Sequence, residues 1–169
     1  NSTEAELVKL FDNLWIDLNI ALGNEVGKVS KVLNVNALNV IKAANTLKKG
    51  SSYVNILTPS VGVGGYCLTK DPLFLNKFAQ KMKLKIYTPI ASRKINDSMP
   101  NYLKSLYEKK IKELKMKQIK ALILGYSFKS NTGDTRFTPV EKFINLIKKK
   151  KLLKQLDIGD PLVSEEKIL

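Results

Sequence analysis

Apolar residues recur at helical spacing along the first part of the chain. Over residues 4–33 they fall three or four positions apart, which predicts one long amphipathic helix, bent near Gly23 or Gly27. Thr3, with Glu6 three positions later, matches a capping box at its start. After a break at 34–36, a shorter helix is expected over 37–47. The apolar positions of the long helix are Leu7, Leu10, Phe11, Leu14, Trp15, Leu18, Leu22 and Val26.

The middle of the chain continues this helical pattern around one glycine-rich loop. A β-like segment at 53–57 precedes the loop, and helices are predicted over 72–82 and 90–117. Pro100 is expected to begin a new turn or to kink the second of these helices.

The pattern changes near residue 119. The apolar run 119–124 is typical of a buried parallel strand, and Gly125 ends it. A polar loop over 126–138, a helix over 139–150 and a second strand over 152–158 follow. The predicted fold is therefore mainly α, with a partial α/β unit at the end that is too small to make a stable sheet alone.

The composition narrows the possible chemistry. The 169 residues are 44% apolar, as in a globular protein, and no apolar run reaches the length of a membrane span. A single cysteine fits a reducing cytoplasm. The sequence has no histidine, which excludes histidine-based triads and argues against a zinc site.

The formal net charge of +14 raises the question of nucleic acid. The lysines follow helical faces, however, and aromatic residues are not interleaved with them as a stacking platform requires. A solvated basic surface is the preferred interpretation, with nucleic-acid binding as the alternative.

Residues 61–72, VGVGGYCLTKDP, contain the only cysteine, Cys67. The glycines allow positive φ angles and close approach of a ligand. Asp71 is predicted to be the N-cap of the next helix, with Pro72 at its first position, so the helix dipole would favour a thiolate at Cys67. A glycine turn beside a buried structural cysteine is the alternative.

A polar line runs along the first helix. Lys9, Asn13 and Asp17 lie four positions apart, beside the apolar stripe. Taken alone, this line is interpreted as the solvent-exposed face of the helix.

Four blocks, in order, give this sequence a family resemblance: 4–25, 54–74, 93–100 (RKINDSMP) and 121–139. They resemble the nucleotide-sugar 6-dehydrogenases, and the run VNIL before GVGG is most similar to the N-acetylhexosamine branch. This resemblance implies a UDP-N-acetylhexosamine as the substrate, with UDP-N-acetylmannosamine as the expected one. The resemblance implies a central helical dimerisation domain at 1–117 and part of a Rossmann-like domain that binds the UDP-sugar at 118–169. The glycine fingerprint of the family's N-terminal NAD domain is absent, so the chain is expected to be a fragment, inactive alone.

The resemblance also implies site residues. The family oxidises a sugar alcohol twice with NAD through a cysteine thiohemiacetal and thioester, and the cysteine matches Cys67. Lys9 matches the acid–base or oxyanion-stabilising lysine, Asn13 the asparagine one turn later, and Asp71 an aspartate that assists water or the lysine. Expected contacts with the substrate are Gly62, Gly64, Gly65, Tyr53, Phe128 and Lys129, and expected contacts with NAD are Lys70 and Arg136.

Several family positions are occupied by other residues. Tyr53 replaces an arginine that the family donates to the partner subunit's site, and Ile16 replaces a second arginine. Ser51 and Tyr66 each replace a histidine. UDP-glucose or another UDP-sugar is the alternative substrate. A homodimer through the first helix is expected, and a non-catalytic helical dimerisation module is the alternative of a different class.

Overall fold

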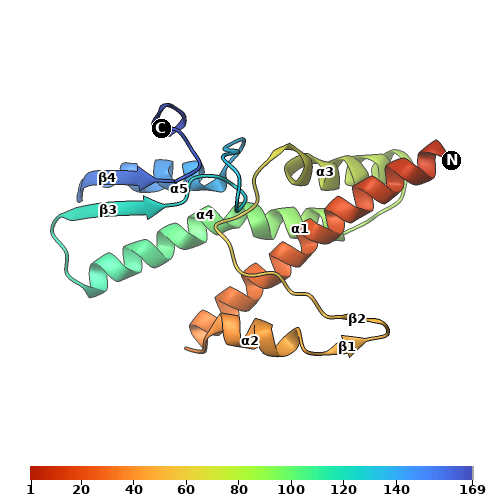
Figure 1. Cartoon of the computed structure of the whole chain (residues 1–169), viewed down its shortest axis with the longest axis horizontal. Coiled ribbons are helices and arrows are strands. Elements are labelled where there is room, and N and C mark those ends of the chain that lie inside the picture. Colours follow the sequence, from red (N-terminus) through yellow and green to blue (C-terminus); the bar gives the residue numbers. More distant parts are fainter. Residues whose placement is uncertain (169) are drawn as a thin grey trace. The chain divides into compact units, whose positions relative to one another are not determined.

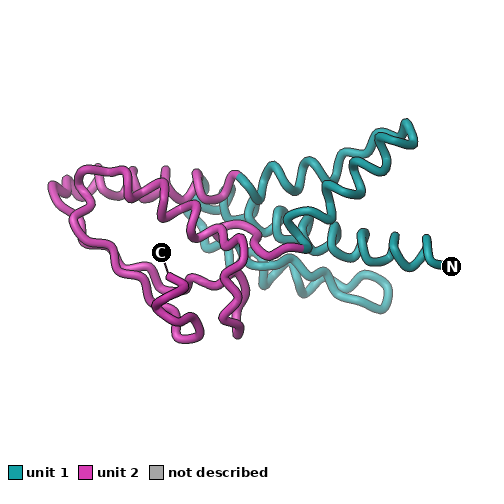
Figure 2. The backbone as a smooth tube through the Cα atoms, turned by 90° about the horizontal axis from the view of Figure 1, so that it is seen from above, with its two compact units in different colours: residues 1–60, 67–97 teal, residues 61–66, 98–169 magenta. Residues whose placement is uncertain are grey.

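The computed structural model describes residues 1–168, which form five α-helices and two sheets of two strands each (Figure 1). The mainly helical fold predicted from the sequence is confirmed. The chain divides into two compact units, coloured in Figure 2: residues 1–60 with 67–97, and residues 61–66 with 98–169. Helix α4 contributes residues 88–97 to the first unit and 98–113 to the second.

The first unit is built on the long helix α1, Ser2–Val32. Its N-cap is Asn1, and the predicted cap at Thr3 is wrong. The Asn1 side chain accepts a hydrogen bond from the Glu4 backbone N–H, while the Glu4 carboxylate accepts from the Asn1 amide and N-terminus. Asparagine caps helices at least as well as threonine, and this box begins the helix two residues earlier.

The two faces of α1 differ from the sequence interpretation. Asn13 and Asp17 are buried, so the polar line is not simply a solvent-exposed face, although Lys9 is exposed. Conversely, much of the apolar stripe faces solvent: Phe11 and Trp15 are each more than half exposed. Sequence periodicity separates polar from apolar faces, but it does not determine which face the rest of the chain covers.

Helix α2, Ala37–Ala44, begins at the N-cap Asn36 and ends three residues before the predicted end. The expected strand at 53–57 is reduced to Ser52–Tyr53 (β2), which pairs antiparallel with Lys48–Lys49 (β1). The rest of this segment runs as extended chain along α1. Asn19 of α1 donates to the Asn55 carbonyl and accepts from the Leu57 N–H, so these backbone groups are bonded to a side chain instead of a strand.

Helix α3, Tyr66–Lys81, begins six residues before the predicted start. Asp71 is therefore not an N-cap, and Pro72 lies inside the helix rather than at its first position. Gly65, with φ +78°, ends the preceding loop and lets the helix start at Tyr66. Helix α4, Thr88–Glu113, likewise continues through Pro100 without a new start.

The second unit contains a parallel βαβ arrangement. Strand β3, Ile119–Leu124, leads through a loop to helix α5, Pro139–Lys148, and then to strand β4, Leu153–Gly159, which pairs parallel to β3. A short 3₁₀ turn, Glu165–Lys167, follows. The core cluster is formed by Tyr126, Val140, Ile144 and Val163.

Strand β3 has the predicted bounds but is not buried on both faces. Ile119 is buried, whereas Leu122 and Leu124 are 62% and 79% exposed. Helix α5 packs on one face of the sheet, and in the described part of the chain the other face carries these exposed leucines. The apolar run is typical of a parallel strand covered on both faces, whereas within residues 1–168 a helix covers only one face of β3.

Candidate functional site

A hydrogen bond between α1 and α3 joins two of the predicted catalytic residues. The Asn13 amide nitrogen donates to Asp71 Oδ2 at 2.6 Å, and both side chains are buried. Asn13 and Asp71 are 58 positions apart in the sequence. Helix periodicity places Asn13 on the same side of α1 as Lys9, one turn earlier. The structure therefore brings three predicted residues to one place between α1 and α3.

Lys9 and Asp71 line the same pocket. This pocket has a volume of about 530 Å³ and is formed by Ala5, Glu6, Lys9, Leu10 and Asp71. The exposed ammonium group of Lys9 and the buried carboxylate of Asp71 line one space that a polar molecule could enter, and the Asn13 amide contacts that carboxylate. Such groups are suited to proton transfer and to stabilising a developing alkoxide.

Cys67 lies in the first turn of α3, not one turn before the helix as the sequence suggested. Its side chain is exposed and it forms no disulfide. The alternative of a buried structural cysteine is therefore wrong. Cys67 and Asp71 are four residues apart on one helix, so their side chains emerge from the same face, with Cβ atoms about 5–6 Å apart. The thiol thus lies one helical turn from the carboxylate that Asn13 contacts.

Beneath this site lies a buried polar network that the sequence analysis did not identify. Asp17 Oδ1 accepts from Arg93 Nη1 at 2.7 Å and from the Asn96 amide at 2.8 Å. Asn96 in turn accepts from the Asn24 amide at 3.0 Å. All four side chains are at least 95% buried. Two features of the sequence could have indicated this network: the polar line of α1, which contains Asp17, and the block RKINDSMP, which contains Arg93 and Asn96.

In the second unit, the glycine loop packs against Phe128. A Cβ atom at Gly64 would lie 2.4 Å from Phe128 Cβ, and one at Gly65 would lie 2.8 Å from the Phe128 ring. The Gly65 N–H donates to the Arg136 carbonyl at 2.8 Å, and Gly62 has φ +136°. The structure thus brings Gly64 and Gly65 together with Phe128, and packing alone requires glycine at these two positions, whereas Gly62 lies earlier in the same loop.

The polar loop after β3 also carries Lys129 and Arg136, both exposed. The Arg136 guanidinium pairs with Asp134, with Nε 2.9 Å from Oδ1, and stacks 4.9 Å from the centroid of the Tyr66 ring. Hydrogen bonds from the Arg136 side chain and backbone lower the pKa of Asp134 to about 2. Arg136 is therefore held in a defined position while its side chain remains accessible to an anion.

The two remaining predicted residues are exposed and belong to the first unit. Lys70 lies on α3, with its ammonium 5.7 Å from the centroid of the Phe74 ring. Tyr53 is 63% exposed on the β1–β2 hairpin. Figure 1 shows this hairpin and α3 on opposite sides of α1, and among the described residues the hairpin makes no contact with α3.

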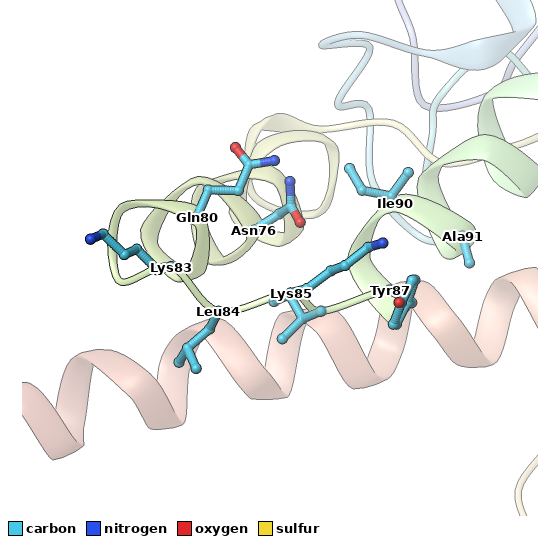
Figure 3. A pocket seen from close by; sticks show the side chains of 9 residues that line it. Asn76, Gln80, Lys83, Leu84, Lys85, Tyr87, Ile90 and Ala91 are labelled. Carbon is cyan, nitrogen blue, oxygen red and sulfur yellow. The ribbon is translucent and has the colours of Figure 1, made fainter.

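A second pocket, of about 610 Å³, lies between α3 and the start of α4 (Figure 3). The figure shows the amides of Asn76 and Gln80 extending from α3 and Ile90 extending from α4. The segment joining the two helices contributes Lys83, Lys85 and Tyr87. None of the residues predicted from the sequence is among the lining residues that the structure describes.

Comparison of the sequence with protein families and with curated proteins points to one family of dehydrogenases. The family "UDP-glucose/GDP-mannose dehydrogenase family, central domain" matches residues 3–98. A UDP-N-acetyl-D-mannosamine dehydrogenase of Methanococcus aeolicus is 40% identical over 147 residues, which are 87% of this chain and 32% of the relative. The chain spans about a third of the length of the curated relatives it matches.

Solved structures agree with this match. The structure of a UDP-D-ManNAc dehydrogenase from Pyrococcus horikoshii matches with a TM-score of 0.85 and 35% identity, covering 97% of this chain and 38% of that one. A UDP-glucose dehydrogenase from Pyrobaculum islandicum matches with a TM-score of 0.80 and 28% identity, covering 96% and 36%. In the described residues no helix combines the length and apolarity that a membrane crossing requires. Since the family match covers more than half of the sequence, this chain belongs to the UDP-glucose/GDP-mannose dehydrogenase family.

Proposed function

We propose that this chain is the central part of an NAD-dependent dehydrogenase that oxidises the 6-hydroxyl of a UDP-N-acetylhexosamine to the acid. The names of its relatives favour UDP-N-acetylmannosamine as the substrate. UDP-glucose or another UDP-sugar is the alternative, supported by the likeness to a UDP-glucose dehydrogenase. The observation that carries the proposal is the Asn13–Asp71 hydrogen bond, because it joins the helix of Cys67 to the helix of Lys9.

Cys67 acts as the nucleophile in this proposal. Its thiolate adds to the carbonyl carbon of the sugar aldehyde, forming a C–S bond and an alkoxide. Lys9 and the second N–H of the Asn13 amide stabilise this alkoxide, since the first N–H is donated to Asp71. Loss of hydride from the resulting thiohemiacetal gives a thioester. Water then attacks the thioester, assisted by Asp71, and the thiolate leaves with release of the acid.

The cofactor and substrate contacts remain those implied by the family. NAD, when bound, accepts the hydride in each of the two oxidations. Lys70 and Arg136 are suited to an anionic cofactor because both cations are exposed. The substrate is held by the glycine loop with Phe128 and Lys129, and by Tyr53 from a partner subunit. We also propose that the isolated chain does not turn over, and that its free thiol is kept reduced in the cytoplasm.

The decisive experiment measures alkylation of the single cysteine by iodoacetamide at neutral pH. We expect Cys67 in the folded chain to react faster than the same thiol in urea-unfolded chain. Lys9→Met should lower the rate, whereas Lys77→Met, at an exposed lysine further along α3, should not. A folded-state rate no higher than that of an ordinary thiol would contradict the assignment of Cys67 as the nucleophile.

The exposed apolar face of α1 supports a second candidate function, a helical dimerisation module. Apolar side chains on this face, between 37% and 58% exposed, recur at helical spacing: Phe11, Trp15, Leu18, Leu22 and Val29. A second copy would bury them. Sedimentation should therefore show a dimer, and Trp15→Lys should dissociate it. Leu124→Lys, on an exposed leucine of β3, is the matched control and should leave the dimer intact. A monomeric native chain would refute this assembly.

A further inference from the structure

A proline interrupts the hydrogen bonding of α3 close to Cys67. Pro72 lies inside the helix and is almost completely buried. In a regular helix the N–H of residue 72 would donate to the carbonyl of Leu68, four residues earlier. Proline has no N–H, so the Leu68 carbonyl loses its helical donor. This carbonyl belongs to the residue directly after Cys67.

Arg93 supplies the missing donor from another helix. Its Nη1 atom lies 3.2 Å from the Leu68 carbonyl oxygen and 2.7 Å from Asp17 Oδ1, while Nη2 donates to Asp97. Arg93 is only 4% exposed. The guanidinium group is a planar fork with several donors, so one side chain reaches the helix carbonyl and both carboxylates.

The position of Arg93 is itself fixed. Asp17 is fully buried and also accepts from the Asn96 amide, which donates to the Asp17 backbone carbonyl as well. Asp17 lies on α1 one turn after Asn13, so α1 holds the first part of α3 at two points. The first is the Asn13–Asp71 bond, and the second runs from Asp17 through Arg93 to Leu68.

We propose that Arg93 is a positioning residue for Cys67. Its guanidinium takes the place of the N–H that Pro72 lacks, and it fixes the first turn of α3 against α1. Arg93 does not touch the thiol and acts only through the Leu68 carbonyl. The catalytic meaning of this arrangement rests on the proposed role of Cys67, but the ordering of the turn does not.

The test is hydrogen exchange in the 169-residue chain at the amides of Lys70 and Asp71, whose helical acceptors are the carbonyls of residues 66 and 67. Arg93→Lys keeps the charge but loses the fork. It should raise exchange at these two amides by roughly ten- to a hundredfold, as expected for loss of a charge-assisted hydrogen bond. In Arg93→Lys combined with Pro72→Ala, the new N–H at position 72 donates to Leu68, so exchange should return to near the native rate.

A purely structural role for Arg93 predicts a different result. Exchange would then rise throughout α1 and α4, and Pro72→Ala would not restore it, because residue 72 does not replace the bond to Asp17. That outcome overturns the proposal. If Arg93→Lys does not fold, Asp97→Ala replaces it. The Asp97 side chain is 60% exposed and pairs with Nη2 of Arg93. Because the change removes this partner, it loosens one arm of the fork and should raise exchange at the same two amides by a smaller factor. No change there also overturns the proposal.

Alkylation of Cys67 separates this inference from the proposed function. If exchange responds and is restored as expected, but the native thiol reacts at an ordinary rate, the role of Arg93 in the turn stands and the catalytic role of Cys67 fails. If the native thiol is fast and exchange does not respond, Cys67 stands and Arg93 is not its positioning residue.

Discussion

Gly23 in the middle of α1 offers a sharp test of how this helix packs. A Cβ atom at this position would lie 2.1 Å from the backbone oxygen of Leu57, whereas ordinary contact begins at 3.4 Å. The extended segment would have to move by about 1.3 Å to accommodate Gly23→Ala. A backbone carbonyl has no rotamer by which to avoid the contact, so the segment must move as a whole.

The expected magnitude follows from the bonds that hold this segment. Asn19 makes two hydrogen bonds to it, and Asn24 accepts a third from the Ser60 N–H. Loss of three such bonds costs about 3 kcal/mol of unfolding free energy at about 1 kcal/mol each. Alanine in place of glycine in a helix returns about 1 kcal/mol. Gly23→Ala should therefore destabilise the chain by about 2 kcal/mol, although helix propensity alone predicts the opposite sign.

Urea unfolding followed by fluorescence of Trp15, the only tryptophan, measures this change within the same helix. At a typical slope of about 1–3 kcal/mol per molar urea, the midpoint should fall by about 1 M. Glu25→Ala, at an exposed position two residues further along α1, is the control and should shift stability by less than about 0.5 kcal/mol. An unchanged or raised midpoint for Gly23→Ala would refute the close packing of the segment on α1.

Three further predictions address the two units. Hydrogen bonds from three backbone N–H groups lower the pKa of Asp160 from the ordinary 3.8 to about 2, so its contribution to stability is present above pH 3.8 and lost as the pH falls toward 2. Asp160→Asn should reduce this loss of stability at low pH, measured in acid titrations by circular dichroism. An acid response identical to that of the native chain contradicts the prediction. Asn13→Ala leaves the Asp71 carboxylate buried without its donor and should lower the unfolding free energy by about 1–3 kcal/mol, measured in urea; an unchanged midpoint would speak against the bond. Ile144→Ala, at a fully buried site, should cost about 2–5 kcal/mol. The exposed Leu124→Ala should cost less than about 0.5 kcal/mol, and equal costs would contradict the one-sided cover of the sheet.

Local sequence patterns were sufficient to predict those helices and strands whose bounds are set by residues near them in the sequence. The apolar run of β3 gave its bounds, and helical spacing gave the extent of α1 to within two residues. The start of α3 was not predictable in the same way. Asp71 followed by Pro72 is a typical helix beginning, and the helix continues through it with a donor from Arg93, which lies 25 positions after Leu68. A partner that distant leaves no trace in local spacing.

The site shows the same division. Residue types and family blocks selected Lys9, Asn13, Cys67 and Asp71, and the structure joins Asn13 to Asp71. The burial of Asp17 was not predictable, because a carboxylate on a helix is usually solvated unless a buried cation pairs with it. That cation, Arg93, lies 76 positions away. The roles proposed for Arg93 and for the site residues therefore remain proposals, which the exchange and alkylation experiments test.

The two-stranded sheet has a practical consequence for handling the chain. In the described residues β3 and β4 pair only with each other, so each presents one outward row of peptide N–H and C=O groups. Such rows can recruit extended segments of other molecules. Lys120 and Lys154, exposed on the two strands, oppose this recruitment by mutual repulsion between copies. Concentrated salt would screen that repulsion, so purified protein should be stored at low ionic strength to avoid precipitation.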